Sequence, residues 1–141
     1  MVNSTSPASE PRSSCPIAAS LDVLGDRWTL VVLRDLLIGG RTHFADFATE
    51  ESIATNTLAE RLQRLRDSGI VARVRDPEDG RRWIYVPRRP AIELIPVLVD
   101  LMIWGIANTR VEVPSEQASA ARHREESIAQ ITEQATSRMV D

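Results

Sequence analysis

Apolar residues recur at helical spacing in the middle of the chain. Leu58, Leu62 and Leu65 lie at i, i+4 and i+7, so they form one stripe of a predicted helix from about Thr55 to Ser68. The rest of that helix surface is polar. Gly69 follows directly, where a glycine in the left-handed conformation typically ends a helix. The pattern predicts an amphipathic helix with one face free.

A two-stranded hairpin is predicted immediately after this helix. Ile70 and Val71 begin an extended segment, and a second strand ends in Ile84-Tyr85-Val86. The Asp-Pro-Glu-Asp-Gly segment at 76–80 between them has the residues that favour a turn. A helix with a free polar face beside a short hairpin is the layout of a winged helix-turn-helix.

Further helices are predicted on the N-terminal side of this unit. The first helix begins at Pro16 and ends at Gly25. The second is capped by Asp26 and ends at Gly39-Gly40. A short third helix, which Thr42 can cap, carries Phe44 and Phe47. The expected buried side of the second helix consists of Trp28, Leu30, Val31, Leu33, Leu36 and Leu37.

The segment from about Pro90 to Asn108 is predicted to be a long helix with a kink at Pro96. It is apolar at nearly every position, whereas a surface helix of a small domain needs only one apolar stripe. Something further must therefore cover it, and the economical cover is the same helix of a second subunit. A polar amphipathic helix from Ser115 to about Met139 follows, and we expect it to embrace the partner subunit.

These elements divide the chain into three parts. Residues 1–14 are rich in Ser and Pro and are predicted to be a disordered tail. Residues 15–110 form the winged helix-turn-helix and dimerisation domain, and residues 111–141 form a C-terminal helical extension. A chain of 141 residues supports one compact domain with tails. We expect a mainly α fold with a small β-hairpin wing, dimerising through its N- and C-terminal helices.

Charge is concentrated around the predicted helix and hairpin. The whole chain has a net charge of −3, but residues 61–89 hold nine arginines and four acidic residues, a local charge of +5. A basic patch in an acidic protein is compatible with DNA binding, because the field depends on how charge is distributed. All 17 basic residues are arginine, so every mechanism that needs a lysine amine is excluded.

Several other classes are excluded or disfavoured. A single cysteine cannot form an internal disulfide, and the first 14 residues resemble no signal peptide. The longest apolar run, Leu94–Ala107, has 14 residues, which is too short to span a bilayer. His43 and His123 lack metal-ligand spacing, and no Ser-His-Asp or Cys-His arrangement is evident. We expect a cytoplasmic protein that is not an enzyme and has no metal, cofactor or membrane contact.

The polar face of the 55–68 helix is the strongest candidate site. Asparagine suits bidentate pairing with adenine and arginine suits guanine, and small polar residues in the first turn allow close approach to a groove. The alternative is a merely solvated face, in which Thr57 and Glu60 form a capping box and Glu60 pairs with Arg64. The candidate DNA-reading residues are Thr55, Asn56, Thr57, Arg61 and Arg64.

The hairpin supplies a second candidate contact. Arg81 and Arg82 would straddle phosphates or enter a minor groove, and Arg73 and Arg75 lie on the first strand. The acidic residues at the tip would repel phosphate. A purely structural hairpin with internal Arg–Asp pairs is therefore the alternative.

Two further features bear on regulation. Cys15 precedes Pro16 at a predicted helix N-terminus, where the helix dipole stabilises a thiolate. It could form an intersubunit disulfide or react with an electrophile, or it could be an incidental, partly buried thiol. An effector could bind between the elements that carry Trp28 and Trp104, unless both tryptophans are core residues. A thiol-dependent enzyme would lack any base beside Cys15.

Four blocks in order resemble the HxlR-type branch of winged-helix transcription regulators, which is related to the MarR group. They are Cys-Pro-Ile-Ala-Ala-Ser with Gly-Asp-Arg-Trp (from Cys15), SIATNTLAERLQRL (from Ser52), SGIVARVRDPEDGRRWIY (from Ser68), and Pro-Val-Leu to Trp-Gly (to Gly105). The resemblance implies a homodimer on a pseudo-palindromic operator, with the 55–68 helix in the major groove and the wing alongside. It also implies that Cys15 is a candidate thiol sensor. The chain departs from the family at 87–91, where the usual helix start is replaced by Pro-Arg-Arg-Pro-Ala.

The sequence therefore predicts a sequence-specific DNA-binding regulator, more readily a repressor than an activator, because a repressor needs only to occupy the promoter. A winged-helix module for protein–protein contact, with the charged hairpin as its docking surface, is the alternative.

Overall fold

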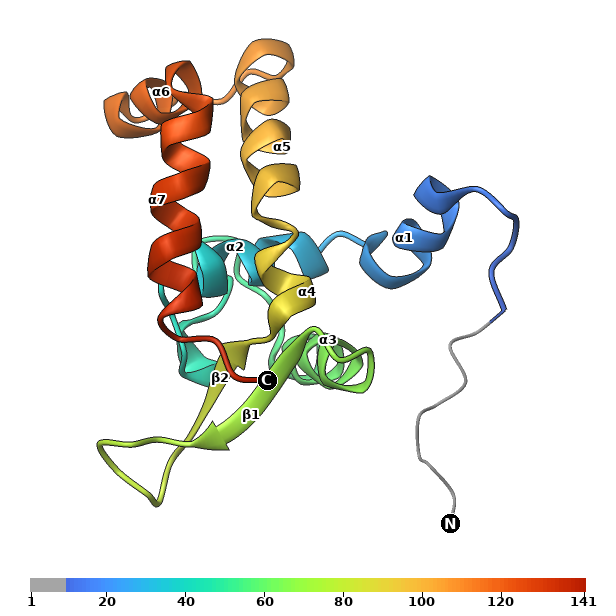
Figure 1. The fold of residues 1–141 in the computed structure, drawn as a ribbon, viewed down its shortest axis with the longest axis vertical. Coiled ribbons are helices and arrows are strands. Elements are labelled where there is room, and N and C mark those ends of the chain that lie inside the picture. The colour runs from blue at the N-terminus through green and yellow to red at the C-terminus, as the bar shows by residue number, and fades with distance from the viewer. Residues whose placement is uncertain (1–9) are drawn as a thin grey trace.

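The computed structural model describes residues 10–141 of the chain, so most of the predicted 1–14 tail lies outside the described residues. Helices build most of the fold, and a single two-stranded antiparallel sheet projects as a wing (Figure 1). The predicted winged helix-turn-helix is confirmed. The elements are α1 (Pro16–Leu24), α2 (Thr29–Leu37), η1 (Phe44–Asp46), α3 (Thr55–Asp67), β1 (Val71–Arg75), β2 (Trp83–Pro87), α4 (Arg89–Ile92), α5 (Ile95–Asn108), α6 (Ser115–Arg122) and α7 (Arg124–Thr136).

The core lies between α2, α3, the sheet, α4, α5 and α7. The predicted stripe of α3, Leu58, Leu62 and Leu65, is buried as expected. On α2 the expectation holds only in part, because Leu33 is fully buried while Trp28 is half-buried. Leu30 and Val31 are also half-buried; Thr29 and Val32 are buried in their place.

Backbone geometry sets the wing relative to α3. Gly69 has φ +72°, the left-handed conformation predicted for it, and the N–H of Ile70 donates to Leu65 O at 2.9 Å. β1 and β2 then pair in the register Val71 with Pro87 to Arg75 with Trp83. Because the turn at Gly69 is tight, the wing leaves directly from the end of α3.

Three predicted helices are shorter than expected. The predicted third helix is only one 3-10 turn, η1. The predicted 90–108 helix divides into α4 and α5, since Pro96 lies in the first turn of α5, where its missing N–H costs no hydrogen bond. The 115–139 helix divides at His123, whose φ of −119° and ψ of 55° are not helical. α4 starts at Arg89 with Pro90 in its first turn, which replaces the family's usual helix start.

The apolar helical segment is longer than the 14-residue run suggested. Arg89–Asn108 has 20 residues and a mean hydropathy of 1.8, so by length and composition alone it could cross a membrane, and 22% of its most apolar window is buried. In the fold, α5 contributes Ile95, Leu98 and Val99 to the core. Met102 and Ile103 pack against this core, whereas Val97, Leu101 and Trp104 are exposed.

The C-terminal extension packs on its own subunit. α7 lies alongside α5 and also contacts α2 and α4 (Figure 1). Arg124 forms a bidentate ion pair with Asp100 of α5, at 2.6 and 2.8 Å. Arg138 donates to the carbonyl oxygens of Leu36 and Leu37, at 2.9 and 3.2 Å, and so satisfies the C-terminus of α2. This part of the extension therefore packs on its own subunit, and its contact with a partner stays a prediction.

Candidate nucleic-acid interface

The exposed face of α3 carries most of the predicted DNA-reading residues. Thr55, Asn56 and Arg64 are exposed, while Thr57 is half-buried. Neither local alternative is present: α3 begins after Ala54 with no side-chain cap, and Glu60 pairs with Arg61 at 2.7 Å instead of with Arg64. The polar residues of this face are therefore not used to cap the helix.

Arg61 is less exposed than we expected for a residue that contacts DNA. Its side chain is 17% exposed, and its Nε lies 3.1 Å from Asp26 Oδ1. Asp26 also accepts from the backbone N–H groups of Trp28 and Thr29, at 2.7 and 2.9 Å, so it caps α2 as predicted. Burial raises the pKa of Asp26, but the hydrogen bonds from Thr29 and Trp28, together with the neighbouring Arg61 guanidinium, outweigh it and the pKa is lowered. Arg61 thus ties α3 to the start of α2, and Arg64 remains the freer cation.

A buried carboxylate fixes the turn between α2 and α3, and the sequence reasoning missed it. Asp35 is 7% exposed and accepts from the N–H of Ala48 at 2.7 Å and from Arg34 Nε at 2.9 Å. Ala48 has φ +50°, an unfavourable conformation for a residue with a Cβ. The available signal was an Arg-Asp pair inside the apolar run of α2.

The same network continues to the start of α3. Arg34 forms a bidentate pair with Glu51, at 2.8 and 3.0 Å, which raises the pKa of Arg34 and lowers that of Glu51. Parallel N–H donors on a carboxylate fix orientation as well as distance. The network therefore holds the loop before α3 against α2.

Two acidic residues of the wing tip, Asp76 and Asp79, contact neighbouring groups of the fold. Asp76 is 8% exposed, accepts from the N–H of Glu78 at 2.9 Å and lies 3.0 Å from His43 Nε2. These two contacts lower the pKa of Asp76, the Glu78 N–H most. Asp79 pairs with Arg81 at 3.1 Å, and that contact lowers its pKa. Asp79 is thus paired with a cation and Asp76 is buried, while Glu78 and Arg82 remain exposed.

Two helices present apolar side chains to solvent. On α5, Val97, Leu101 and Trp104 lie at i, i+4 and i+7 and are 46%, 47% and 59% exposed. The alternative that both tryptophans are core residues is therefore wrong for Trp104. α1 has no buried residue, projects from the body of the fold, and exposes Ile17 and Leu21 (Figure 1).

Cys15 is exposed and immediately precedes α1, as predicted. Its own N–H donates to Ser13 Oγ at 3.2 Å. Within residues 10–141 no group of three or more His, Cys, Asp or Glu side chains is arranged to hold a metal ion.

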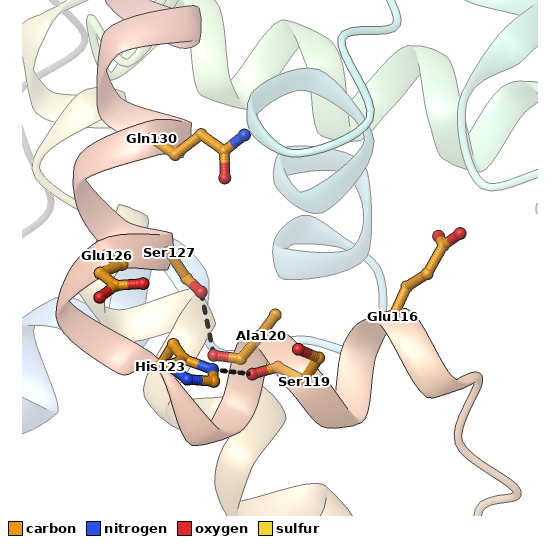
Figure 2. A pocket seen from close by; sticks show the side chains of 7 residues that line it. All are labelled: Glu116, Ser119, Ala120, His123, Glu126, Ser127 and Gln130. Atoms are coloured by element: carbon orange, nitrogen blue, oxygen red, sulfur yellow. Dashed lines mark hydrogen bonds between the residues drawn. The ribbon is translucent and has the colours of Figure 1, made fainter.

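A surface hollow of about 390 Å³ lies between α6 and α7 (Figure 2). Ser127 Oγ donates to Ala120 O at 2.9 Å beside it, and His123 Nδ1 lies 3.0 Å from Ser119 O. Glu116 and Glu126 also line it and would repel phosphate. This hollow is therefore separate from the nucleic-acid interface, and it does not lie between Trp28 and Trp104.

Known transcription regulators are similar to part of this chain in sequence. An HTH-type transcriptional regulator of Mycobacterium tuberculosis is 34% identical over 89 residues, which are 63% of this chain and 56% of that protein. One from Synechocystis is 32% identical over 99 residues, 70% of this chain and 73% of that protein. The match thus spans little more than half the length of the mycobacterial relative.

Two solved structures have similar folds. PA1607, described as a candidate transcription factor, gives a TM-score of 0.65 at 33% identity over 73% of this chain and 72% of that chain. The reduced form of the transcriptional regulator YodB from B. subtilis gives 0.56 at 26% identity over 70% and 97%. The model of the HxlR-like helix-turn-helix matches residues 23–113. With this match over most of the fold, the chain belongs to the HxlR-like helix-turn-helix family of transcription regulators, a class of proteins that are not enzymes.

Proposed function

We propose that this protein binds a pseudo-palindromic DNA operator as a homodimer, in the cytoplasm, and represses the genes behind it. The observation that carries the proposal is the free polar face of α3, with Asn56 and Arg64 exposed beside a cationic hairpin on a family-matched scaffold. In this geometry α3 enters the major groove and the wing lies over the adjacent backbone. Repression is the simpler mode, because it requires only occupancy of the promoter.

The seven residues predicted from sequence receive different roles in this proposal. Thr55, Asn56 and Arg64 are exposed on α3 and would contact bases or nearby phosphates. Thr57 lies at the edge of this face, and Arg61 would contribute mainly by holding α3 in place through Asp26. On the wing, Arg82 is the freer phosphate contact, since Arg81 shares its charge with Asp79.

The apolar stripe of α5 supports the homodimer. An exposed tryptophan and two aliphatic side chains in line are the kind of surface that a second copy buries. Two subunits paired through α5 and α1 would present two α3 helices. Half-sites about 34–36 Å apart, one turn of the duplex, would match such a pair.

Arg82→Ala and Asn56→Ala are expected to affect DNA binding in different ways. Loss of the Arg82 charge removes a backbone contact, so affinity for all sequences falls and the salt slope of the binding constant flattens by about 0.9. Loss of the Asn56 amide removes a base contact, so discrimination at one position relaxes by about 1–3 kcal/mol. Salt titrations on a selected operator and on a scrambled duplex measure both.

Arg110→Ala, which removes an exposed arginine outside the wing, is the control for net charge. Unchanged binding in both site variants would contradict this assignment of the DNA-reading face. Wild-type protein without any salt-dependent retention on DNA would favour the protein–protein module instead.

Cys15 is a proposed control point for this binding. Its thiol is exposed next to α1, a helix proposed to lie at the dimer interface. Two Cys15 thiols, one from each subunit, would be oxidised to a disulfide by one hydrogen peroxide, which is reduced to two waters. The solved neighbour YodB is described in a reduced form, which supports testing this chemistry here. A small-molecule effector remains a further proposal.

Peroxide treatment is expected to produce a dimer on non-reducing gels and to change operator affinity in the wild type, with dithiothreitol reversing both. Cys15→Ser should bind DNA normally and be insensitive to peroxide. Equal sensitivity of the two proteins would contradict a role for Cys15.

A further inference from the structure

The first strand of the wing carries two arginines that stack on one tryptophan. The guanidinium carbon of Arg73 lies 4.5 Å from the centroid of the Trp83 ring, and that of Arg75 lies 3.9 Å from it. Arg75 is the direct cross-strand partner of Trp83 in the register of the hairpin. All three side chains are exposed, Trp83 by 38%.

These two arginines differ from Arg61 and Arg81 in how their donors are used. Asp26 and Glu60 take donors of Arg61, and Asp79 takes donors of Arg81. Within residues 10–141, no ion pair joins Arg73 or Arg75 to a carboxylate. Stacking occupies the flat face of a guanidinium and leaves its N–H groups at the edge free to donate. Both guanidinium groups are thus held in place while their N–H groups remain free to donate hydrogen bonds.

The stacked residues lie on the sheet face that carries the core residues Val71 and Tyr85. Side chains alternate along a strand, so Val71, Arg73 and Arg75 share one face of β1. Val71 and its neighbour on that face, Tyr85, are buried in the core, and α3 packs against β1. Further out along the same face, the core ends and the arginines reach solvent. They therefore form an exposed cationic surface on the part of the wing beyond the core.

We propose that Arg73 and Arg75 bind the phosphodiester backbone of duplex DNA, and that Trp83 positions them for it. Planar guanidinium groups match phosphate oxygens in bidentate geometry. An arginine already fixed by stacking loses less side-chain freedom on binding. The inference rests on the proposed function, and it moves the main cationic contact of the wing from the tip to the strand.

Salt titrations with a labelled duplex of mixed sequence test the contact. The slope of log K against log [salt] should flatten by about 0.9 in Arg73→Ala and in Arg75→Ala, and by about twice that in the double variant. The matched control replaces Arg110 and Arg122, two exposed arginines outside the wing, by alanine. A control slope that flattens as much as that of the double variant would show a net-charge effect and overturn the site. So would a wild-type slope in the double variant.

A double-mutant cycle tests the positioning role of Trp83. Trp83→Leu keeps both charges and should lower affinity about three- to tenfold, while Trp83→Phe, which retains a ring, should recover most of the loss. In the Arg73→Ala, Arg75→Ala background, Trp83→Leu should have no further effect. An equal loss in both backgrounds would overturn the positioning role. Melting temperatures equal to that of the wild type exclude unfolding as the cause.

A wrong proposed function and a wrong assignment of the wing residues would give different results. If the wild type binds no duplex in a salt-dependent manner, the proposed function itself is wrong. If the wild type binds with a steep slope and the wing variants match it, only the assignment of Arg73, Arg75 and Trp83 is wrong.

Discussion

Trp104→Glu is expected to convert the protein to a monomer and to weaken operator binding by about a hundredfold or more. Trp104 lies in the stripe of α5 with Val97 and Leu101, and the three side chains are 59%, 46% and 47% exposed. A carboxylate placed in that seam would have to be buried without a partner when two copies meet, and this costs several kcal/mol. A monomer then holds one half-site only and loses the effective concentration that links the second.

Analytical ultracentrifugation and operator titration measure the two effects together. Ala129→Glu adds the same charge at an exposed position of α7 and should remain dimeric with wild-type affinity. A dimeric Trp104→Glu protein with full affinity would contradict pairing through α5. A monomeric variant with full affinity would contradict the need for two half-sites.

Asp35→Ala is expected to lower the free energy of unfolding by about 2–4 kcal/mol, a large fraction of the usual 5–15 kcal/mol. The buried carboxylate satisfies the N–H of Ala48 and the Nε of Arg34. Without it, a buried donor is left unpaired, and the left-handed conformation of Ala48 loses the contact that holds it. The loop before α3 should then loosen, so DNA affinity should fall even where the variant remains folded.

Urea unfolding and operator titration at low temperature check both parts of this expectation. Glu50→Ala removes an exposed carboxylate from the same loop and should change stability by less than about 0.5 kcal/mol. If Asp35→Ala is as stable as Glu50→Ala, the network does not hold the turn.

The sequence predicted those features of the fold that depend on residues close to one another in the chain. The leucine spacing of α3, the left-handed Gly69 and the turn at 76–80 each depend on residues close in the chain, and the structure confirms them. The kink expected at Pro96 corresponds to the break between α4 and α5, whereas the break at His123 was missed, because the polar periodicity continues across it.

Pairings between distant residues could not be predicted in the same way. Arg61 was placed on the exposed face by helical geometry, but Asp26, 35 residues earlier, draws it inward. Asp76 was expected to repel DNA, but His43 and the turn backbone hold it inside the wing. The stacking of Arg73 and Arg75 on Trp83 depends on the strand register, which the sequence left open.

Selection of bound duplexes from a random-sequence library tests the central claim most directly. The protein is predicted to enrich a pseudo-palindrome with half-sites about 10 base pairs apart, bound by two subunits, and Asn56→Ala should broaden the preference within each half-site. Recovery of an unenriched library by wild-type protein that is folded and dimeric would contradict sequence-specific DNA binding.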